Sequence, residues 1–305
     1  MFKNKAFLVV IAFSIFLLSA CSTNIEGVAI QVNKEIITVE EYEREFEVYK
    51  NLYERQYGED ALSQEGINGE TIAEELKDNI ISKLITEALI EKESRDKNFQ
   101  INEEQLQKSI DEYKESIGGE EKYLEFLANN SISEEYFREN MRETLLLEEH
   151  KENIMKDFDI KEDEAIKYFN ENKEGIVEIR ASHILFSNEQ DAKRVLEQLQ
   201  NGEDFEELAK LESLDSVSAI NGGDLGYFSR GSRIPEFEER AFLLDIGEIS
   251  EVLKTEVGYH IILVKDKKED YKELKDKTIN LIKEEKYLEY LDSLRDNAKI
   301  TIYIE

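Results

Sequence analysis

Near the N-terminus, two short runs in which apolar and polar residues alternate are followed by a long region in which apolar residues recur at the spacing of a helix. Residues 28–32 and 35–38 are rich in Val and Ile and flank Asn33-Lys34, a pattern that predicts a small hairpin. Thr38 is a suitable cap for a helix that begins near Glu40. From there to Lys173 apolar residues recur every three or four positions, which predicts helices. The clearest apolar face contains Ile72, Leu76, Ile80, Leu84 and Ala88.

Polar residues mark further helix starts in this region. Asn102 with Gln105 three positions later is a capping-box pattern, and Ser133 before two Glu predicts another start. His150 lies among charged residues and is predicted to be a solvated surface residue. A row of aromatic residues is predicted to be core, with a groove for unfolded chains as the alternative: Tyr42, Phe46, Tyr49 and Tyr53.

The pattern changes at residue 179, where apolar and polar residues alternate. This alternation predicts a strand on which His183 shares a face with Ile179 and Ala181. Helices are predicted at 189–200, 205–211 and 236–243, a Gly-rich loop follows the second of them, and strands are predicted at 249–253 and 259–264. His260 shares a face with Ile262 on the last strand. The segment is therefore predicted to be a compact α+β unit in which the two His meet across the sheet.

The C-terminal segment returns to helical spacing and ends in a strand pattern. Residues 270–297 are predicted to be one helix, with Leu274, Leu281, Leu288, Leu291 and Leu294 near one face. Residues 299–304 are predicted to be a strand. Because a lone strand is unstable, we expect it to pair with the hairpin at 28–38, which would make one discontinuous helical domain around the inserted unit.

Charge narrows the possible partners. The 305-residue chain has a formal net charge of -31, which argues against nucleic acid, because a phosphate backbone is bound by Lys and Arg. Such a charge serves solubility and could also attract basic or unfolded polypeptides.

The N-terminus has the pattern of an export signal. Lys3 and Lys5 precede a mostly apolar stretch at residues 7–18 that is too short to span a bilayer comfortably. The stretch ends in Leu18-Ser19-Ala20-Cys21, which resembles the bacterial lipobox, in which the Cys is acylated. Cys21 is the only Cys in the chain. An ordinary cleavage site and an uncleaved anchor remain alternatives.

Three kinds of chemistry are open to the central unit. A metal site would use His183, His260 and either Asp215 or Asp224, but these residues have no local spacing signature. A hydrolase would use Ser216 or Ser218 as nucleophile, but the nucleophile-elbow motif is missing. The third possibility is a buried neutral His pair that shapes a peptide pocket.

The central motifs resemble those of the parvulin-type peptidyl-prolyl isomerases. The resemblance covers about a third of the chain, and its motifs occur in the family's order. With the lipobox and the flanking helices, the whole chain resembles the PrsA-type foldase lipoproteins, with SurA-like chaperones nearest in layout. The motifs are Ala181-Ser182-His183-Ile184-Leu185, Gly222-Gly223-Asp224-Leu225-Gly226-Tyr227-Phe228, Phe237 with Ala241-Phe242, Gly247-Glu248-Ile249-Ser250 and Gly258-Tyr259-His260-Ile261-Ile262.

The resemblance implies roles for individual residues. His183 and His260 match the paired active-site His, and Asp215 matches the acidic or Cys position before the glycine loop. Leu225 and Phe237 match residues that receive the proline ring. The family usually carries Gln-Met after the position of Gly231. Here the corresponding residues are Ser232-Arg233, so a cation replaces the Met that packs on proline.

The predicted fold class is α+β, with a helical chaperone domain built from N- and C-terminal segments and an inserted parvulin-like domain. The expected boundaries are 1–20 for a lipoprotein signal, 21–175 for the first chaperone segment, 176–268 for the isomerase and 269–305 for the second segment. The expected function is isomerisation of X-Pro bonds in unfolded or partly folded exported polypeptides, by a protein held on the outer face of the cell membrane through acylated Cys21. No cofactor and no metal are expected, and a homodimer is left open. The alternatives are a non-catalytic holdase and a surface lipoprotein for adhesion or solute capture.

Overall fold

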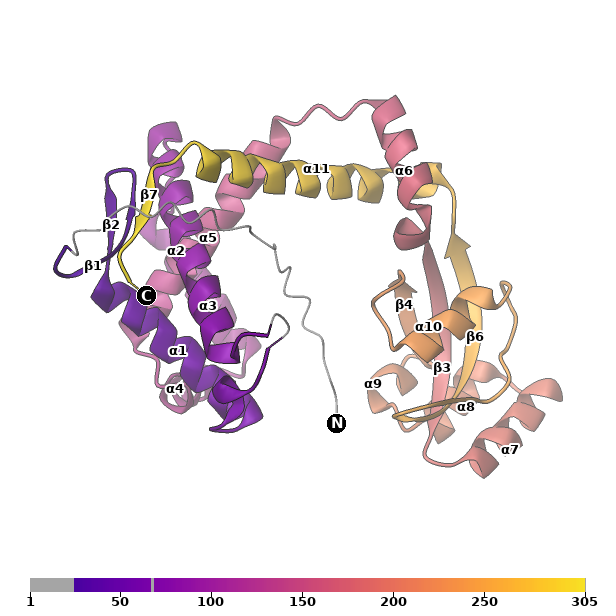
Figure 1. The fold of residues 1–305 in the computed structure, drawn as a ribbon. Coiled ribbons are helices and arrows are strands. Elements are labelled where there is room, and N and C mark those ends of the chain that lie inside the picture. The colour runs from indigo at the N-terminus through magenta and orange to yellow at the C-terminus, as the bar shows by residue number, and fades with distance from the viewer. Residues whose placement is uncertain (1–24, 67–68, 305) are drawn as a thin grey trace. The chain divides into compact units, whose positions relative to one another are not determined.

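The structure is a computed structural model that describes residues 25–66 and 69–304. The chain divides into two compact units. The terminal unit combines the chain up to His150 with the chain from Leu291 onward, and the central unit is Lys151–Tyr290. Figure 1 shows the elements of both units. The predicted lipidation residue Cys21 lies outside the described residues. Within the described ranges, none of the helices has the length and apolar content needed to cross a membrane.

The terminal unit contains a three-stranded antiparallel sheet that joins the two ends of the described chain. Its order is β2-β1-β7, and Ile30 in β1 pairs with Ile302 in β7. The predicted hairpin and its pairing with the C-terminal strand are confirmed. The elements of this unit are β1 (Val28–Val32), β2 (Glu35–Thr38), α1 (Val39–Tyr57), a 3-10 helix (Ala61–Ser63), α2 (Ile72–Lys97), α3 (Glu103–Ser116), α4 (Glu120–Asn129), most of α5 (Glu134–Lys156), the end of α11 (Tyr271–Asp296) and β7 (Ile300–Ile302).

Helix starts in the terminal unit follow their capping residues. Thr38 and Asn102 each form the predicted cap as a reciprocal capping box, with Glu41 and Gln105 respectively. The Ser133 hydroxyl accepts from the backbone N–H of Tyr136 at 3.0 Å, so the predicted start of α5 is also confirmed.

The core of this unit forms where α1 and α2 meet the sheet. Ile80 and Ala88 from the predicted face of α2 are buried there, and Tyr42 is buried with them. Phe46 and Tyr49 pack against the same cluster, so most of the aromatic row belongs to the core.

The prediction for His150 was wrong. Its exposed fraction is 0%, and its Nε2 lies 3.0 Å from Oε2 of Glu93, a residue of α2. The charged neighbours of His150 in the sequence do not indicate this burial, because the hydrogen-bond partner that makes it possible comes from another helix.

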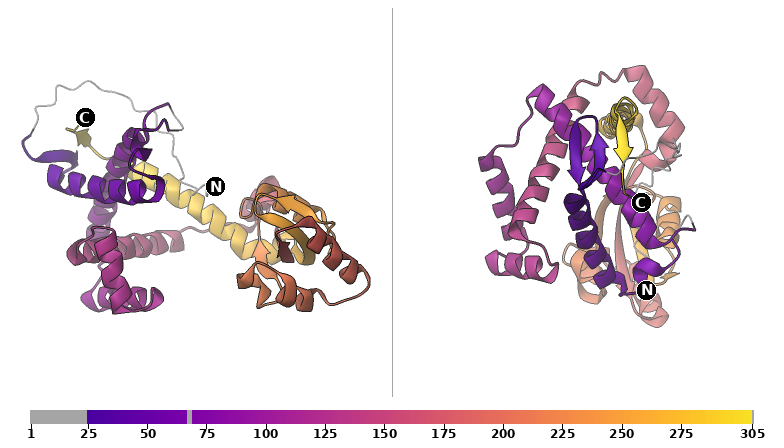
Figure 2. Two further views of the ribbon diagram at one scale, coloured as in Figure 1. Left: turned by 90° about the horizontal axis from the view of Figure 1, so that it is seen from below. Right: turned by 60° about the vertical axis from the view of Figure 1, so that its left-hand side comes forward.

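The central unit has a four-stranded antiparallel sheet of order β4-β3-β6-β5. Its two long strands, β3 and β6, form the middle of the sheet, and Figures 1 and 2 show them side by side. Glu178 at the start of β3 pairs with Lys268 at the end of β6. The elements are α6 (Glu162–Ile176), β3 (Glu178–Phe186), α7 (Glu189–Gln200), α8 (Phe205–Glu212), α9 (Ser216–Ala219), β4 (Asp224–Phe228), α10 (Pro235–Leu243), β5 (Leu253–Thr255), β6 (Gly258–Lys268) and the larger part of α11.

Helices cover both faces of this sheet. On one face, Ile184 and Ile261 pack against residues of α7 and α8 such as Val195 and Leu208. On the other face, Ile262 packs with the α10 residues in a second cluster, which contains Ile179, Ala181, Phe228, Phe237, Ala241, Leu244 and Val264.

Some elements differ from the predictions. β4 and α9 occupy the predicted Gly-rich loop, and β5 begins only at Leu253. Ile249 contributes a single β-bridge, to Leu263, rather than a strand. On α11, Leu274 is buried as predicted, but Leu288 is 43% exposed.

Candidate active site

His183 and His260 come from the neighbouring strands β3 and β6. In the register of these strands His260 is opposite Leu185, two residues beyond His183, so the two imidazoles are diagonal neighbours on one face. Their rings stack with centroids 5.4 Å apart and planes 22° apart. The predicted meeting of the two His is confirmed.

A row of hydrogen bonds runs through the pair. The two Nδ1 atoms are 3.1 Å apart, and His183 Nε2 lies 2.8 Å from Oδ2 of Asp215. At the other end, the Thr255 hydroxyl lies 2.9 Å from His260 Nε2. Ser218 donates to Oδ2 of Asp215 at 2.6 Å. The structure therefore brings together the three residues predicted as catalytic and adds one hydroxyl at each end.

The charge on Asp215 sets the direction of every proton in this row. A carboxylate can only accept, so Nε2 of His183 carries the hydrogen and Nδ1 of His183 is a bare acceptor. His260 must then donate from Nδ1, and its Nε2 accepts from the Thr255 hydroxyl. All four imidazole nitrogens are used inside the protein, so neither ring has an N–H left for a substrate.

Burial keeps both imidazoles neutral. It lowers the pKa of His183, against the opposing effect of Asp215. Burial, together with the neighbouring His183, lowers the pKa of His260 to about 4. Burial acts to raise the pKa of Asp215, but hydrogen bonds from Ser218 and His183 outweigh it, and the pKa falls to about 2. Near neutral pH the site is a carboxylate beside two neutral rings.

The glycine pair before β4 lets the chain pass close to His183. The His183 N–H donates to the Gly223 carbonyl at 2.9 Å. Gly223 has φ +78°, and a Cβ at this position would lie only 2.2 Å from the His183 carbonyl oxygen. Both the backbone conformation and the space require glycine here.

Apolar side chains close one side of the His pair. Phe237 is 3% exposed and meets both rings edge-on, with centroid distances of 5.7 Å to His183 and 5.4 Å to His260. Leu225 is half-buried and packs against the buried apolar cluster that contains Phe237. Arg233 is exposed. It donates to the Leu225 carbonyl at 3.2 Å, and its guanidinium lies 5.2 Å from the centroid of Phe228. The cation is therefore held beside one of the two residues predicted to receive proline.

The structure does not support the metal site or the hydrolase that the sequence left open. Asp224 pairs with Arg180 through an Nε–Oδ2 contact of 3.1 Å rather than with either His. No group of three His, Cys, Asp or Glu side chains in the described ranges is arranged to hold a metal ion. Ser218 donates to Asp215 and not to a His, and Ser216 is exposed, so the hydrolase arrangement does not form.

Thr255 and Ser218 were not predicted as part of the site. Thr255 is five residues before His260, on the strand that pairs with it, and this spacing across a tight turn is the signal that could have revealed it. Ser218 was considered only as a nucleophile. Its position three residues after Asp215, on a helix that Asp215 caps, could have indicated a hydrogen bond between the two.

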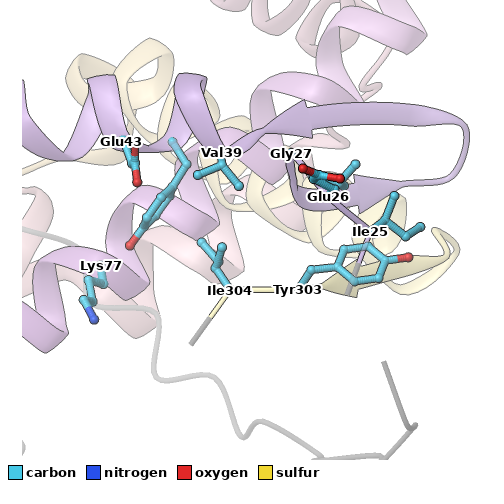
Figure 3. Close-up of a pocket in the computed structure, with 10 residues that line it drawn as sticks. Ile25, Glu26, Gly27, Val39, Glu43, Lys77, Tyr303 and Ile304 are labelled. Atoms are coloured by element: carbon cyan, nitrogen blue, oxygen red, sulfur yellow. The ribbon is translucent and has the colours of Figure 1, made fainter. Parts of the chain in front are cut away.

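The terminal unit contains a separate pocket of about 690 Å³. Val39 and Ile304 project into it, and Glu43 and Lys77 lie toward one end (Figure 3). The residues that line it include no His, Ser or Cys, and its ionisable side chains are Glu26, Tyr42, Glu43, Lys77 and Tyr303.

Comparisons with known proteins agree with this geometry. Residues 165–268 match the family described as PPIC-type PPIASE domain, and residues 2–151 match the SurA-like N-terminal domain. The chain is 34% identical over 266 residues to the foldase protein PrsA of Caldanaerobacter subterraneus. The aligned region covers 85% of this chain and 81% of that protein.

Solved structures include similar proteins. The crystal structure of the peptidylprolyl isomerase PrsA from Bacillus anthracis is 31% identical, with a TM-score of 0.33, and the match covers 73% of this chain and 99% of that one. The solution structure of the parvulin NmPin from Nitrosopumilus maritimus is 47% identical, with a TM-score of 0.28, over 29% of this chain and 96% of that one.

The fold of the central unit and its family match define a parvulin-type peptidyl-prolyl cis-trans isomerase. The match along most of the chain narrows the class further. The chain belongs to the PrsA foldase family.

Proposed function

We propose that the central unit isomerises X-Pro bonds without forming a covalent intermediate, and that His183, His260 and Asp215 carry the activity. The observation behind this proposal is the row of hydrogen bonds, in which a charged Asp215 fixes two buried neutral imidazoles against Phe237. The proline ring would lie on Phe237 and Leu225, with the amide against the imidazoles.

The chemistry required is modest. The planar amide is stabilised by resonance that places negative charge on its oxygen, and rotation must cross a barrier of roughly 18–20 kcal/mol. Twisting reduces that charge. An apolar wall removes water that would stabilise the planar form, and the nearby Asp215 carboxylate disfavours charge on the oxygen. Both effects stabilise the twisted amide relative to the planar one. Because no imidazole N–H is free, the rings act as a rigid neutral wall rather than as acids.

The test is the isomerase activity of the soluble chain from Ser22, with His183→Ala and Asp215→Ala beside it. We expect both variants to lose most of the kcat/KM for short X-Pro peptides. Unchanged rates in both variants would refute the assignment of these residues.

The second part of the proposal is that the terminal unit holds unfolded segments, and that residues 21–175 and 269–305 act together as the chaperone around an isomerase at 176–268. It is supported by a pocket of about 440 Å³ that combines aliphatic side chains such as Leu84 and Leu146 with several Glu, which outnumber the two cations of the lining, Arg44 and Arg142. Such a lining suits segments that carry both apolar and basic residues. The test is to measure whether the chain suppresses the aggregation of a reduced, unfolded protein.

Arg233 favours a second candidate function, a holdase whose isomerase unit is structural. A cation beside the proline slot must be moved or desolvated when an apolar ring enters. This candidate predicts suppression of aggregation with no acceleration of isomerisation for any residue before proline.

We also propose that the protein is exported, is anchored to the cell membrane through acylated Cys21, and assists the folding of secreted proteins. The lipobox pattern at residues 18–21 and the similarity to PrsA foldases support this proposal. Mass spectrometry of the membrane fraction should find an acylated N-terminal Cys, and Cys21→Ser should release the protein from that fraction. An unmodified chain in the membrane fraction would contradict the anchor.

A further inference from the structure

The ammonium of Lys277 on α11 joins three other elements of the central unit. It donates to the carbonyl of Ile176, the last residue of α6, at 2.9 Å, and to Oε1 of Glu178, the first residue of β3, at 2.8 Å. It also donates to the hydroxyl of Ser229, the residue after β4. An ammonium has three hydrogens, so these three acceptors use all of them. The Ile176 carbonyl is in the last turn of its helix, where a cation is favoured.

The bond to Ser229 attaches α11 to the segment between β4 and α10. We call residues 229–234 of this segment the slot loop. The Ser232 hydroxyl donates to the Ser229 carbonyl at 2.6 Å, and the Gly231 N–H donates to Oε2 of Glu238, a residue of α10, at 2.6 Å. Because these bonds hold the loop as a folded turn, fixing its first residue limits the positions that the rest of it can take.

Both ends of the slot loop continue into the apolar wall of the candidate site. Phe228, which is 5% exposed, immediately precedes the loop, and its ring centroid lies 6.3 Å from that of Phe237. Phe237 follows the loop in α10 and meets both imidazoles edge-on. Within the loop, Arg233 donates to the carbonyl of Leu225. A shift of the loop would therefore displace the residues proposed to receive proline.

We propose that Lys277 is a positioning residue for the isomerase reaction: through Ser229 it fixes the slot loop, so that Phe237 and Leu225 are already arranged to receive proline. Such preorganisation strengthens binding, because less order remains to be imposed when the peptide enters. The three acceptors of Lys277 are not catalytic residues, so the effect is on binding rather than on rotation of the amide. The inference rests on the proposed proline slot. It places a determinant of binding beyond residue 268, where the match to the isomerase family ends.

The test uses two variants of the full chain from Ser22. Lys277→Met removes the ammonium and all of its bonds, whereas Ser229→Ala removes only the bond to the slot loop. The matched control is Lys275→Met, which removes the same charge from the same helix. Lys275 pairs with Glu162 on α6, so the control also breaks a contact between α11 and α6 but leaves the slot loop attached.

NMR titration and exchange with a short X-Pro peptide give KM and kcat separately. We expect Lys277→Met and Ser229→Ala each to raise KM about fivefold, the factor of one net hydrogen bond, with kcat within about twofold. Lys275→Met should leave both constants unchanged, and Ser229→Thr, which keeps the hydroxyl, should keep KM within about twofold. Arg233 keeps its bond to the Leu225 carbonyl in all of these variants, so release of that cation should not offset the loss.

The Ser229 variants give the sharpest contradiction. An unchanged or lower KM in Ser229→Ala, or an equal rise of KM in Ser229→Thr, would overturn the inference, because the hydroxyl would then not position the slot. Ser229→Ala keeps the other two bonds of Lys277, so it decides the question if Lys277→Met does not fold.

Urea unfolding of the same variants tests a purely structural role for Lys277. A lower free energy of unfolding in Lys277→Met with KM unchanged would assign this residue to stability alone and overturn the inference. A fall in kcat with KM unchanged would overturn it too, because the residue would then act on the rotation step. These outcomes leave the isomerase function standing, whereas an unsubstituted chain without activity would remove the function and the inference with it.

Discussion

Replacing Asp215 with Asn should reverse the order of protons in the site while keeping its shape. The carboxylate accepts from three donors: His183, Ser218 and the backbone N–H of Val217. An amide of the same shape has one acceptor and one donor end. If its oxygen faces His183, its NH₂ meets the Val217 N–H. If it turns over, the NH₂ must donate to Nε2 of His183, which moves the hydrogen of that ring to Nδ1.

The size of the effect follows from these bonds. Hydrogen bonds to a charged acceptor contribute roughly 1.5–3 kcal/mol each, against about 0.5–1.5 for neutral ones. Two side-chain donors, at 2.8 Å and 2.6 Å, lose that charge. We therefore expect Asp215→Asn to lose about 2 kcal/mol of unfolding free energy. If half or more of this difference acts on the twisted amide, kcat/KM falls roughly 5- to 30-fold.

The assay is exchange NMR of an X-Pro peptide, with urea unfolding and ¹⁵N shifts of the imidazoles measured on the same samples. In the unsubstituted chain, hydrogen should be found on Nε2 of His183 and on Nδ1 of His260. Ser218→Ala, which removes only one donor to Asp215, serves as a graded control and should lose less of both rate and stability. Hydrogen on Nδ1 of His183 in the unsubstituted chain would refute the reasoning, as would an Asp215→Asn variant with full activity.

Four other perturbations test the structure. The lowered pKa of His260, about 4, means that its contribution to stability is present above the ordinary His value of about 6.5 and is lost as the pH falls toward 4. Urea unfolding from about pH 7 to 4 should show this loss, while the isomerase rate stays flat between about pH 6 and 8; a rate that changes tenfold within that window would contradict the neutral pair. Arg233→Met removes the cation beside Leu225 and should lower KM for X-Pro peptides about threefold, and an unchanged or higher KM would show that the cation does not hinder binding. Lys83→Met leaves Glu45, which is 4% exposed, and Glu87 without the cation that lies 3.0 Å and 2.8 Å from them, and should cost about 3 kcal/mol in urea unfolding, most of it restored by the further changes Glu45→Gln and Glu87→Gln; no restoration would mean that packing rather than charge accounts for the loss. Deleting residues 299–305 removes β7 and should lower the melting temperature of the terminal unit, with isomerase rates on short peptides retained; loss of those rates would show that the central unit depends on that sheet.

Local signals made much of the fold predictable. Thr38 and Asn102 cap their helices through residues three positions away, so a few neighbouring residues are enough to predict their role. The period-two alternation around His183 and His260 placed the two rings on the same face of the sheet, with Ala181 and Ile262.

Contacts between distant segments were harder to predict. His150 is buried against Glu93, 57 residues earlier, and nothing near His150 in the sequence indicates that partner. β4 was missed because its glycines favour a loop, and its strand character comes from pairing with β3. Ser218 and Thr255 were missed as site residues because their roles depend on partners that the fold brings within hydrogen-bonding distance.

The pairing of Glu178 with Lys268 places the two ends of the isomerase sheet side by side. Neighbouring antiparallel strands are about 5 Å apart, so a host chain can leave and re-enter at almost the same point. Such an insertion costs the host little more closure entropy than a short loop would. The two adjacent ends of this sheet are thus points at which it could be grafted into a surface loop of an unrelated protein.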